Sequence, residues 1–155
     1  MENQNAVIIF GSSRSDGNTR KIVDFLVSHA QFDLIDLNDY AISYYDYQHK
    51  NSADDFIPLM EKITSEYGTL IFATPVYWYT MSAVMKTFFD RISDLLRIRK
   101  DVGRQLRGKN MAVVSCSSDD EAIDGFELPF TRSAQYLGMP FVGFAHCWMD
   151  GNEMP

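Results

Sequence analysis

The feature that most constrains the fold of this chain is a regular alternation between short apolar runs and segments with helical periodicity. Continuous apolar runs of this kind are typical of strands that are buried on both faces of a parallel sheet. They occupy residues 6–10, 32–37, 69–73, 111–115 and 141–145. Helical spacing occupies residues 18–30, 56–67, 81–96 and 126–137. The resulting order β-α-β-α-β-α-β-α-β predicts an α/β domain with a doubly wound parallel sheet of five strands.

Proline, glycine and short polar residues indicate where the expected helices begin and end. Pro58 fits the first turn of its helix, where a missing N–H is harmless, and Asp55 is then the expected N-cap. Thr80 or Ser82 is expected to cap the helix that carries the strongest apolar stripe in the chain. Gly138 predicts the end of the last of these helices.

The composition is that of one globular domain over residues 1–155, with 46% hydrophobic and 23% charged residues. The net charge of −7 argues against a general binder of nucleic acid or of anionic membranes, because both need a basic surface. The N-terminus lacks the basic start of a signal peptide, and no apolar stretch is long enough to span a bilayer. Cys116 and Cys147 have no metal-binding spacing. We therefore expect a soluble cytoplasmic protein without a bound metal.

The end of the sequence bears on the expected assembly. Only about ten residues follow the fifth expected strand, which leaves no room for a long helix after it. In a doubly wound sheet such a helix would cover one face beside the first helix. Without it, apolar sheet surface would be exposed, which is unusual for a monomer. We therefore expect a homo-oligomer, either a dimer or a tetramer.

The first loop, residues 11–19, is rich in groups that bind anions. It holds three serines, a threonine, two glycines and Arg14, and it leads directly into the first helix. Hydroxyls and free backbone N–H groups at a helix N-terminus form an anion site. The loop lacks both the P-loop lysine and the G-x-G-x-x-G fingerprint, so it best suits the terminal phosphate of a mononucleotide. The alternative is a polar turn in which Asn18 or Ser15 caps the helix.

The third loop, residues 74–82, places three aromatic residues in a row after the third strand. Tyr77, Trp78 and Tyr79 cannot all point in one direction, so at least one is expected across the cleft, where it could stack on a flat ring. Pro75 stiffens the turn, and backbone N–H groups of the loop could bond to polar ring atoms. The alternative is that these side chains pack beneath the loop.

The segment after the fourth strand is expected to form the third wall of this site. Ser115, Ser117 and Ser118 could donate hydrogen bonds to the polar edge of a ring. Cys116 is interpreted as an unreactive thiol, since no nearby histidine or phosphatase motif accompanies it.

The three histidines and the tyrosines at residues 44–47 give weaker indications of function. His29, His49 and His146 form no metal-binding pair and are interpreted as structural residues. The tyrosines of the loop after the second strand either roof the cleft or pack against a neighbouring subunit: Tyr44, Tyr45 and Tyr47.

Three segments together resemble the NAD(P)H-dependent FMN reductase family of flavodoxin-like proteins. They are the loop at residues 12–19, Thr-Pro-Val-Tyr-Trp at 74–78, and Met-Ser-Ala-Val-Met-Lys-Thr-Phe-Phe-Asp-Arg at 81–91. The resemblance spans nearly the whole chain and implies the strand order 2-1-3-4-5. It also implies FMN as cofactor and NAD(P)H as co-substrate, with a structural role for Asp90 and Arg91 at their helix.

The resemblance also assigns parts of the cofactor to parts of the chain. The FMN phosphate would lie on Ser12, Arg14, Asn18 and Thr19, and residues 75–78 would border the isoalloxazine. No protein residue is assigned as catalytic, because the flavin carries the chemistry. Residue types and resemblance together give the candidate FMN-binding set: Ser12, Ser13, Arg14, Ser15, Gly17, Asn18, Thr19, Pro75, Val76, Tyr77, Trp78, Ser115, Cys116, Ser117 and Ser118.

The resemblance implies an oxidoreductase that passes electrons from NAD(P)H to a flavin, quinone, azo or nitro acceptor by a ping-pong mechanism. One alternative is a flavodoxin-type electron carrier without its own NAD(P)H turnover. Another is an FMN-binding or degenerate protein with a regulatory or structural role. Related iron–sulfur flavoproteins carry clustered cysteines after the second strand, whereas residues 44–49 here contain none, so we expect no cluster.

Overall fold

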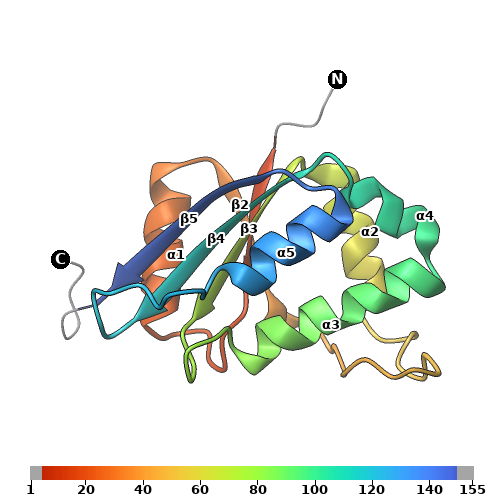
Figure 1. Cartoon of the computed structure of the whole chain (residues 1–155), viewed down its shortest axis with the longest axis horizontal. Helices are drawn as coiled ribbons and strands as arrows, with labels where there is room; N and C mark the ends of the chain where they lie inside the picture. The colour runs from red at the N-terminus through yellow and green to blue at the C-terminus, as the bar shows by residue number, and fades with distance from the viewer. Residues whose placement is uncertain (1–4, 150–155) are drawn as a thin grey trace.

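A single parallel sheet with the strand order β2-β1-β3-β4-β5 organises the protein (Figure 1). The coordinates are a computed structural model that describes residues 5–149. The strands are β1 Ala6–Phe10, β2 Phe32–Asp36, β3 Thr69–Pro75, β4 Asn110–Ser117 and β5 Phe141–Trp148. Both the expected fold class and the expected strand order are confirmed.

Helices cover the two faces of the sheet unequally, as Figure 1 shows. The helix α1 (Asn18–His29) covers one face, while α2 (Phe56–Glu66), α3 (Ala83–Arg97) and α5 (Leu128–Leu137) cover the other. Shorter turns complete the chain: η1 Leu37–Asp39, α4 Lys100–Gly103 and η2 Arg104–Leu106. Within residues 5–149, no helix has the length and apolar character required to cross a bilayer.

Three strands are longer at their carboxyl ends than the apolar runs predicted. The strand β4 continues through Cys116 to Ser117, because Cys116 pairs with Pro75 of β3 and Ser117 pairs with Trp148 of β5. Cys116 and Ser117 therefore belong to the strand and not to the loop expected after it, and the side chains of Ser115 and Cys116 point to opposite faces of the sheet. This placement corrects the expected position of the third wall.

The helix ends also differ from the prediction at two places. Asp55 occupies the N-cap position of α2, but its carboxylate accepts from the backbone of Ala41 at 2.7 Å and gives the helix no side-chain cap. The expected capping role of Asp55 is therefore wrong. The helix α5 begins at Leu128, two residues later than expected, because a turn in which Phe126 N–H donates to Ile123 C=O precedes it.

Other expected helix ends are confirmed. The hydroxyl of Ser82 accepts from the backbone N–H of Met85 at 3.1 Å and caps α3, so Ser82 and not Thr80 is the N-cap. Gly138 ends α5 in the left-handed conformation with φ of 73°, which glycine adopts without strain.

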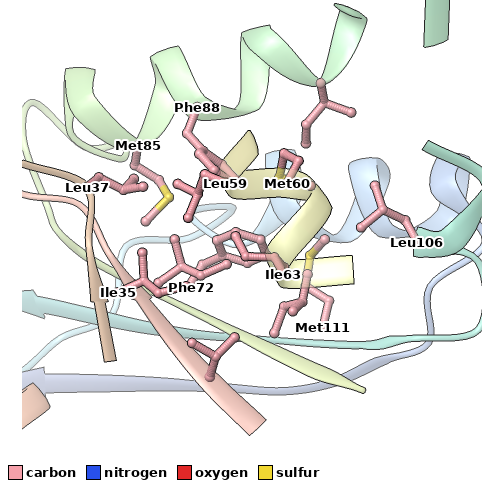
Figure 2. Close-up of a cluster of buried hydrophobic side chains, with 14 of the residues drawn as sticks. Ile35, Leu37, Leu59, Met60, Ile63, Phe72, Met85, Phe88, Leu106 and Met111 are labelled. Atoms are coloured by element: carbon pink, nitrogen blue, oxygen red, sulfur yellow. The ribbon is translucent and has the colours of Figure 1, made fainter. Parts of the chain in front are cut away.

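The main hydrophobic core lies between the sheet and the helices α2 and α3 (Figure 2). Phe72 of β3 meets Phe88 of α3, and the two ring centroids are 6.1 Å apart. Met60 and Ile63 of α2 fill the space beside them. The apolar stripe of α3 thus fixes the helix that follows the third loop, which positions that loop at the carboxyl edge of the sheet.

On the face of the sheet that α1 covers, the edge strand β5 is left partly uncovered. Gly143 and Ala145 of β5 pair in register with Ala112 and Val114, whose side chains belong to the α1 side of the sheet. Both β5 positions are exposed. The expectation that no long helix follows β5 concerns residues 150–155, which lie outside the described part of the chain.

Candidate FMN site

The carboxyl ends of β3 and β4, together with the loops that follow β1, β3 and β4, line a cavity of about 200 Å³ at this edge of the sheet. Ligands of doubly wound sheets bind at this edge, where the strand order reverses. All of the residues that line the cavity were in the set predicted from the sequence: Ser12, Arg14, Gly17, Asn18, Thr19, Pro75, Val76, Tyr77, Cys116, Ser117 and Ser118. Four predicted residues lie outside this lining: Ser13, Ser15, Trp78 and Ser115.

A larger groove of about 360 Å³ lies between α3 and α5. None of the first-loop residues contributes to it, and much of its lining consists of apolar residues such as Phe89 and Pro129. The smaller cavity is the better candidate site, because hydroxyls, a guanidinium group and a helix N-terminus converge there.

The N-terminus of α1 is prepared for an anion. Gly17 occupies the N-cap position, so no side chain caps the helix, and the first turn contains no acidic residue. The N–H groups of that turn have no intrahelical partner and carry the positive end of the helix dipole. The alternative in which Asn18 or Ser15 caps α1 does not hold in this structure.

Arg14 lies directly against Gly17. A Cβ atom at position 17 would stand 2.5 Å from the Nε of Arg14, closer than real contacts allow. The absence of a side chain at position 17 therefore lets the guanidinium group approach the helix N-terminus. This arrangement adds a full positive charge to the site.

The hydroxyl of Ser12 makes only long hydrogen bonds within the protein. The side chain is only 4% exposed, and its partners are the Tyr77 hydroxyl at 3.4 Å and the Arg14 N–H at 3.5 Å. Both distances are at the outer limit of a hydrogen bond, so a ligand oxygen can compete for this hydroxyl. Together with the buried Thr19, these donors fit a phosphate group.

Two residues that sequence reasoning missed hold the first loop in place. The amide of Asn38 donates to the backbone C=O of Ser12 at 2.9 Å and to the Ser15 hydroxyl at 3.2 Å. Ser82, besides capping α3, donates from its hydroxyl to the Gly11 C=O at 2.8 Å. No local pattern marks these contacts, because each joins the first loop to a segment distant in the sequence.

The third loop is a tight turn with an unusual backbone. Tyr77 and Thr80 exchange backbone hydrogen bonds of 2.9 and 3.2 Å, and between them Trp78 and Tyr79 have φ of 48° and 69°. Two successive residues with positive φ define a type I′ turn, which normally uses Asn and Gly. Bulky aromatic residues are strained in this conformation, and such strain is concentrated at functional sites.

The strained turn directs its aromatic residues differently. Trp78 and Tyr79 are 91% and 69% exposed, whereas Tyr77 is 38% exposed and lines the cavity. Within the described residues, the amide N–H groups of Trp78 and Tyr79 have no acceptor. The expectation of one aromatic residue at the cleft thus corresponds to Tyr77, and two free donors lie beside it.

The hydroxyl of Tyr77 reaches back to the first loop, where it lies 2.7 Å from Ser13 Oγ. Burial by itself raises the pKa of this phenol, but hydrogen bonds from Ser12 and Ser13 and the positive charge of Arg14 outweigh burial and lower the pKa below its ordinary value. The phenol oxygen therefore lies in a region that favours negative charge.

The third wall is held by a histidine. The Nε2–H of His146 donates to the C=O of Asp119 at 2.8 Å, so Nδ1 accepts from the hydroxyl of Ser115 at 2.7 Å. Ser115, which is fully buried, therefore supports the wall from behind. Ser117 and Ser118 line the cavity, and the hydroxyl of Ser117 donates to the C=O of Asp119 at 2.9 Å. The register of β4 with β5, which places His146 beside Ser115, is the signal that would have identified this role.

Cys116 also lines the cavity, but its chemistry is that of a buried thiol. Burial raises its pKa above the ordinary value and outweighs a hydrogen bond from Thr19 that lowers it. A raised pKa leaves little thiolate at neutral pH, so Cys116 is a poor nucleophile.

The five-stranded parallel sheet with the order β2-β1-β3-β4-β5 defines a flavodoxin-like fold. The solved Trp repressor binding protein from Bacillus subtilis has this fold, with a TM-score of 0.73, 28% identity and coverage of 94% of this chain and 88% of that one. An FMN-dependent NADH-azoreductase from Bacillus anthracis str. Ames Ancestor, solved with FMN, has a TM-score of 0.66 at 12% identity, over 96% of this chain and 91% of its own.

Sequence comparison identifies the family within this class. A profile of the NADPH-dependent FMN reductases matches residues 5–151. YwqN from Bacillus subtilis (strain 168), named as an NAD(P)H-dependent FMN-containing oxidoreductase, is 33% identical over an alignment of 147 residues that covers 88% of this chain and 81% of YwqN. The chain belongs to the NADPH-dependent FMN reductase family, whose members are oxidoreductases that use FMN and NAD(P)H.

Proposed function

We propose that the first loop of this protein holds the phosphate of FMN at the N-terminus of α1. The observation that carries this proposal is the uncapped helix N-terminus beside the guanidinium group of Arg14. Ser12, Asn18 and Thr19 supply further donors from the cavity wall. Ser13 and Ser15 lie just outside the lining and shape the same loop.

The isoalloxazine ring would extend from the phosphate toward the third loop and the end of β4. The free N–H groups of Trp78 and Tyr79 can donate to polar ring atoms and stabilise negative charge that develops there. Ser118 offers a hydroxyl from the wall at the end of β4, and Pro75 and Val76 form the apolar part of the cavity.

Bound FMN supplies the redox chemistry by accepting hydride from NAD(P)H and passing electrons to a second substrate. The titratable side chains of the lining are Arg14, Tyr77 and Cys116, none of which is a general base at neutral pH. The protein therefore acts by binding and orienting the reactants. We propose a ping-pong order, with a flavin, quinone, azo or nitro compound as the acceptor.

The proposed cofactor is tested by an absorbance spectrum of the purified protein, recorded before and after anaerobic addition of NADPH. We expect a flavin spectrum that is bleached by NADPH. A colourless protein that gives no heat when titrated with FMN would exclude the proposal. Arg14→Gln should weaken FMN binding, whereas Arg132→Gln on the exposed side of α5 should not, which separates the local charge from net charge.

The ping-pong order is tested by initial rates at several concentrations of NADPH and of a quinone. Parallel double-reciprocal lines support it, and intersecting lines contradict it. Rates with azo and nitro compounds then define the acceptor class.

We also propose that the protein works as a homo-oligomer. The support is the exposed α1-side surface at Gly143 and Ala145 of the edge strand β5.

A further inference from the structure

Tyr77 belongs to the third loop, yet its functional group lies at the first loop. Its hydroxyl is 2.7 Å from Ser13 Oγ and 3.4 Å from Ser12 Oγ. The same side chain lines the cavity together with Arg14 and Thr19. The phenol therefore stands at the end of the site where the anion-binding groups converge, away from the exposed aromatic residues of its own turn.

The backbone of the third loop fixes this placement. Reciprocal hydrogen bonds with Thr80 close the turn directly after Tyr77, and Val76 N–H donates to Cys116 C=O at 2.9 Å directly before it. The backbone on both sides of Tyr77 is thus held by neighbouring elements. A hydroxyl held in position in this way loses little conformational entropy when a ligand binds.

The donor arrangement leaves one hydrogen available. A phenol has a single O–H and can accept at the same oxygen, and a serine hydroxyl can act in either sense. When Ser13 donates to the phenol oxygen, the O–H of Tyr77 is free to donate to a ligand. The neighbouring Arg14 makes an anionic ligand favourable at this point.

We propose that Tyr77 is a phosphate-binding residue, whose hydroxyl, oriented by Ser13, donates to the terminal phosphate of FMN and makes the protein prefer FMN to riboflavin. This inference rests on the proposed FMN site and changes the role of Tyr77 within it. The sequence placed Tyr77 at the ring, whereas the structure assigns it to the phosphate. Trp78 and Tyr79 remain as the ring-side residues of the turn.

The test compares the affinities of the flavin-free protein for FMN and for riboflavin by calorimetric titration. In Tyr77→Phe we expect FMN to bind about ten- to a hundredfold more weakly, as for loss of a hydrogen bond to a charged group, and riboflavin to bind within about twofold of wild type. Tyr136→Phe is the matched control, because it removes the same atom from an exposed tyrosine that does not line the cavity, and we expect it to change neither affinity.

A second variant tests whether Ser13 orients the hydroxyl of Tyr77. Ser13→Ala should weaken FMN and not riboflavin, and its effect should be non-additive with that of Tyr77→Phe, because the two hydroxyls act as one unit. Thermal unfolding of each variant verifies that it is folded. Inorganic phosphate should compete with FMN in the wild type and compete less effectively in Tyr77→Phe.

Each outcome decides the question. Equal losses for FMN and riboflavin would place the hydroxyl at the ring and overturn the inference. Unchanged or tighter FMN binding in Tyr77→Phe would show that the phenol is not a ligand. Failure of the wild type to bind either flavin would overturn the proposed function itself, and with it this inference.

Discussion

At the scale of single residues, Gly17 shows how an absent side chain prepares a site. As the N-cap of α1 it leaves the helix without a side-chain cap, and it leaves room for the guanidinium group of Arg14. A methyl group at position 17 would overlap the flexible end of Arg14 and not the backbone. The arginine can move away without disturbing the fold, so position 17 separates binding from stability.

We therefore expect Gly17→Ala to weaken FMN binding about tenfold, the effect of losing one charge-assisted hydrogen bond. The unfolding temperature should fall by only a few degrees, because Arg14 can move away from the new methyl group and the poorer N-cap costs about 1 kcal/mol. Calorimetric titration and thermal unfolding measure the two quantities. Lys62→Gln on the exposed side of α2 is the control and should affect neither. An unchanged FMN affinity would show that Arg14 does not hold the phosphate.

At the scale of elements, buried charges connect α3 to the loop between β2 and α2. Arg91 is 0% exposed and bonds to Asp94 of its own helix at 2.7 Å and to Asp54 of the loop at 2.6 Å. His49 joins the same cluster at 2.7 Å from Asp94. None of these residues lines the cavity, so Arg91 and His49 have the structural roles that the sequence analysis gave them.

Arg91→Met should lower the free energy of unfolding by about 3–5 kcal/mol, because it leaves two carboxylates without their buried partner. Burial raises the pKa of Asp54, but bonds from Arg91, Ser43 and Phe56 outweigh burial and lower it. Because the pKa of Asp54 is lower in the folded protein than in the unfolded chain, its carboxylate stabilises the fold at any pH above the usual aspartate pKa. This stabilisation is lost as the pH falls through the pKa of Asp54 in the folded protein.

The pH dependence of the free energy of unfolding tests the role of Asp54 more directly than a single measurement at neutral pH. Urea unfolding between pH 7 and about pH 2 should show the difference between wild type and Arg91→Met shrinking below pH 4, the usual range of aspartate. Arg99→Met is the control, since its partners Glu61 and Asp101 are exposed and its effect should be much smaller. A difference that stays constant over this range would contradict the role of Asp54.

At the scale of the whole molecule, the two faces of the sheet are covered to different extents. The helices α2, α3 and α5 cover one face, whereas α1 alone covers the other within residues 5–149. The edge strand β5 is the least covered, with Val142 57% exposed and Ala145 also exposed. Uncovered apolar strand surface favours association between protein chains.

We expect sedimentation velocity at micromolar concentration to show a dimer or larger oligomer. Ala145→Lys should shift the protein toward the monomer, because association would bury the added charge. Ser65→Lys on the exposed side of α2 is the control and should leave the assembly unchanged. A stable wild-type monomer would contradict the proposed oligomer.

Much of the site was predictable because it depends on local chemistry. The hydroxyls and glycines of residues 11–19 come directly after an apolar run, so their position at a strand end follows from periodicity alone. The same reasoning failed for Cys116 and Ser117, since the apolar run ends before the strand does. The pairing of β4 with β3 and β5 decides where the strand ends. A shift of one residue along the strand moves a side chain to the other face of the sheet.

By itself, the sequence determined the succession of strands and helices and the polar groups at the strand ends, because burial of apolar side chains imposes periods that each segment carries alone. The resemblance to a family added the strand order and the cofactor. Only the tertiary structure decided that His146 supports the wall, that Asn38 braces the first loop and that the hydroxyl of Tyr77 meets Ser13. These contacts join segments far apart in the chain, and they form only when packing fixes the distance between them.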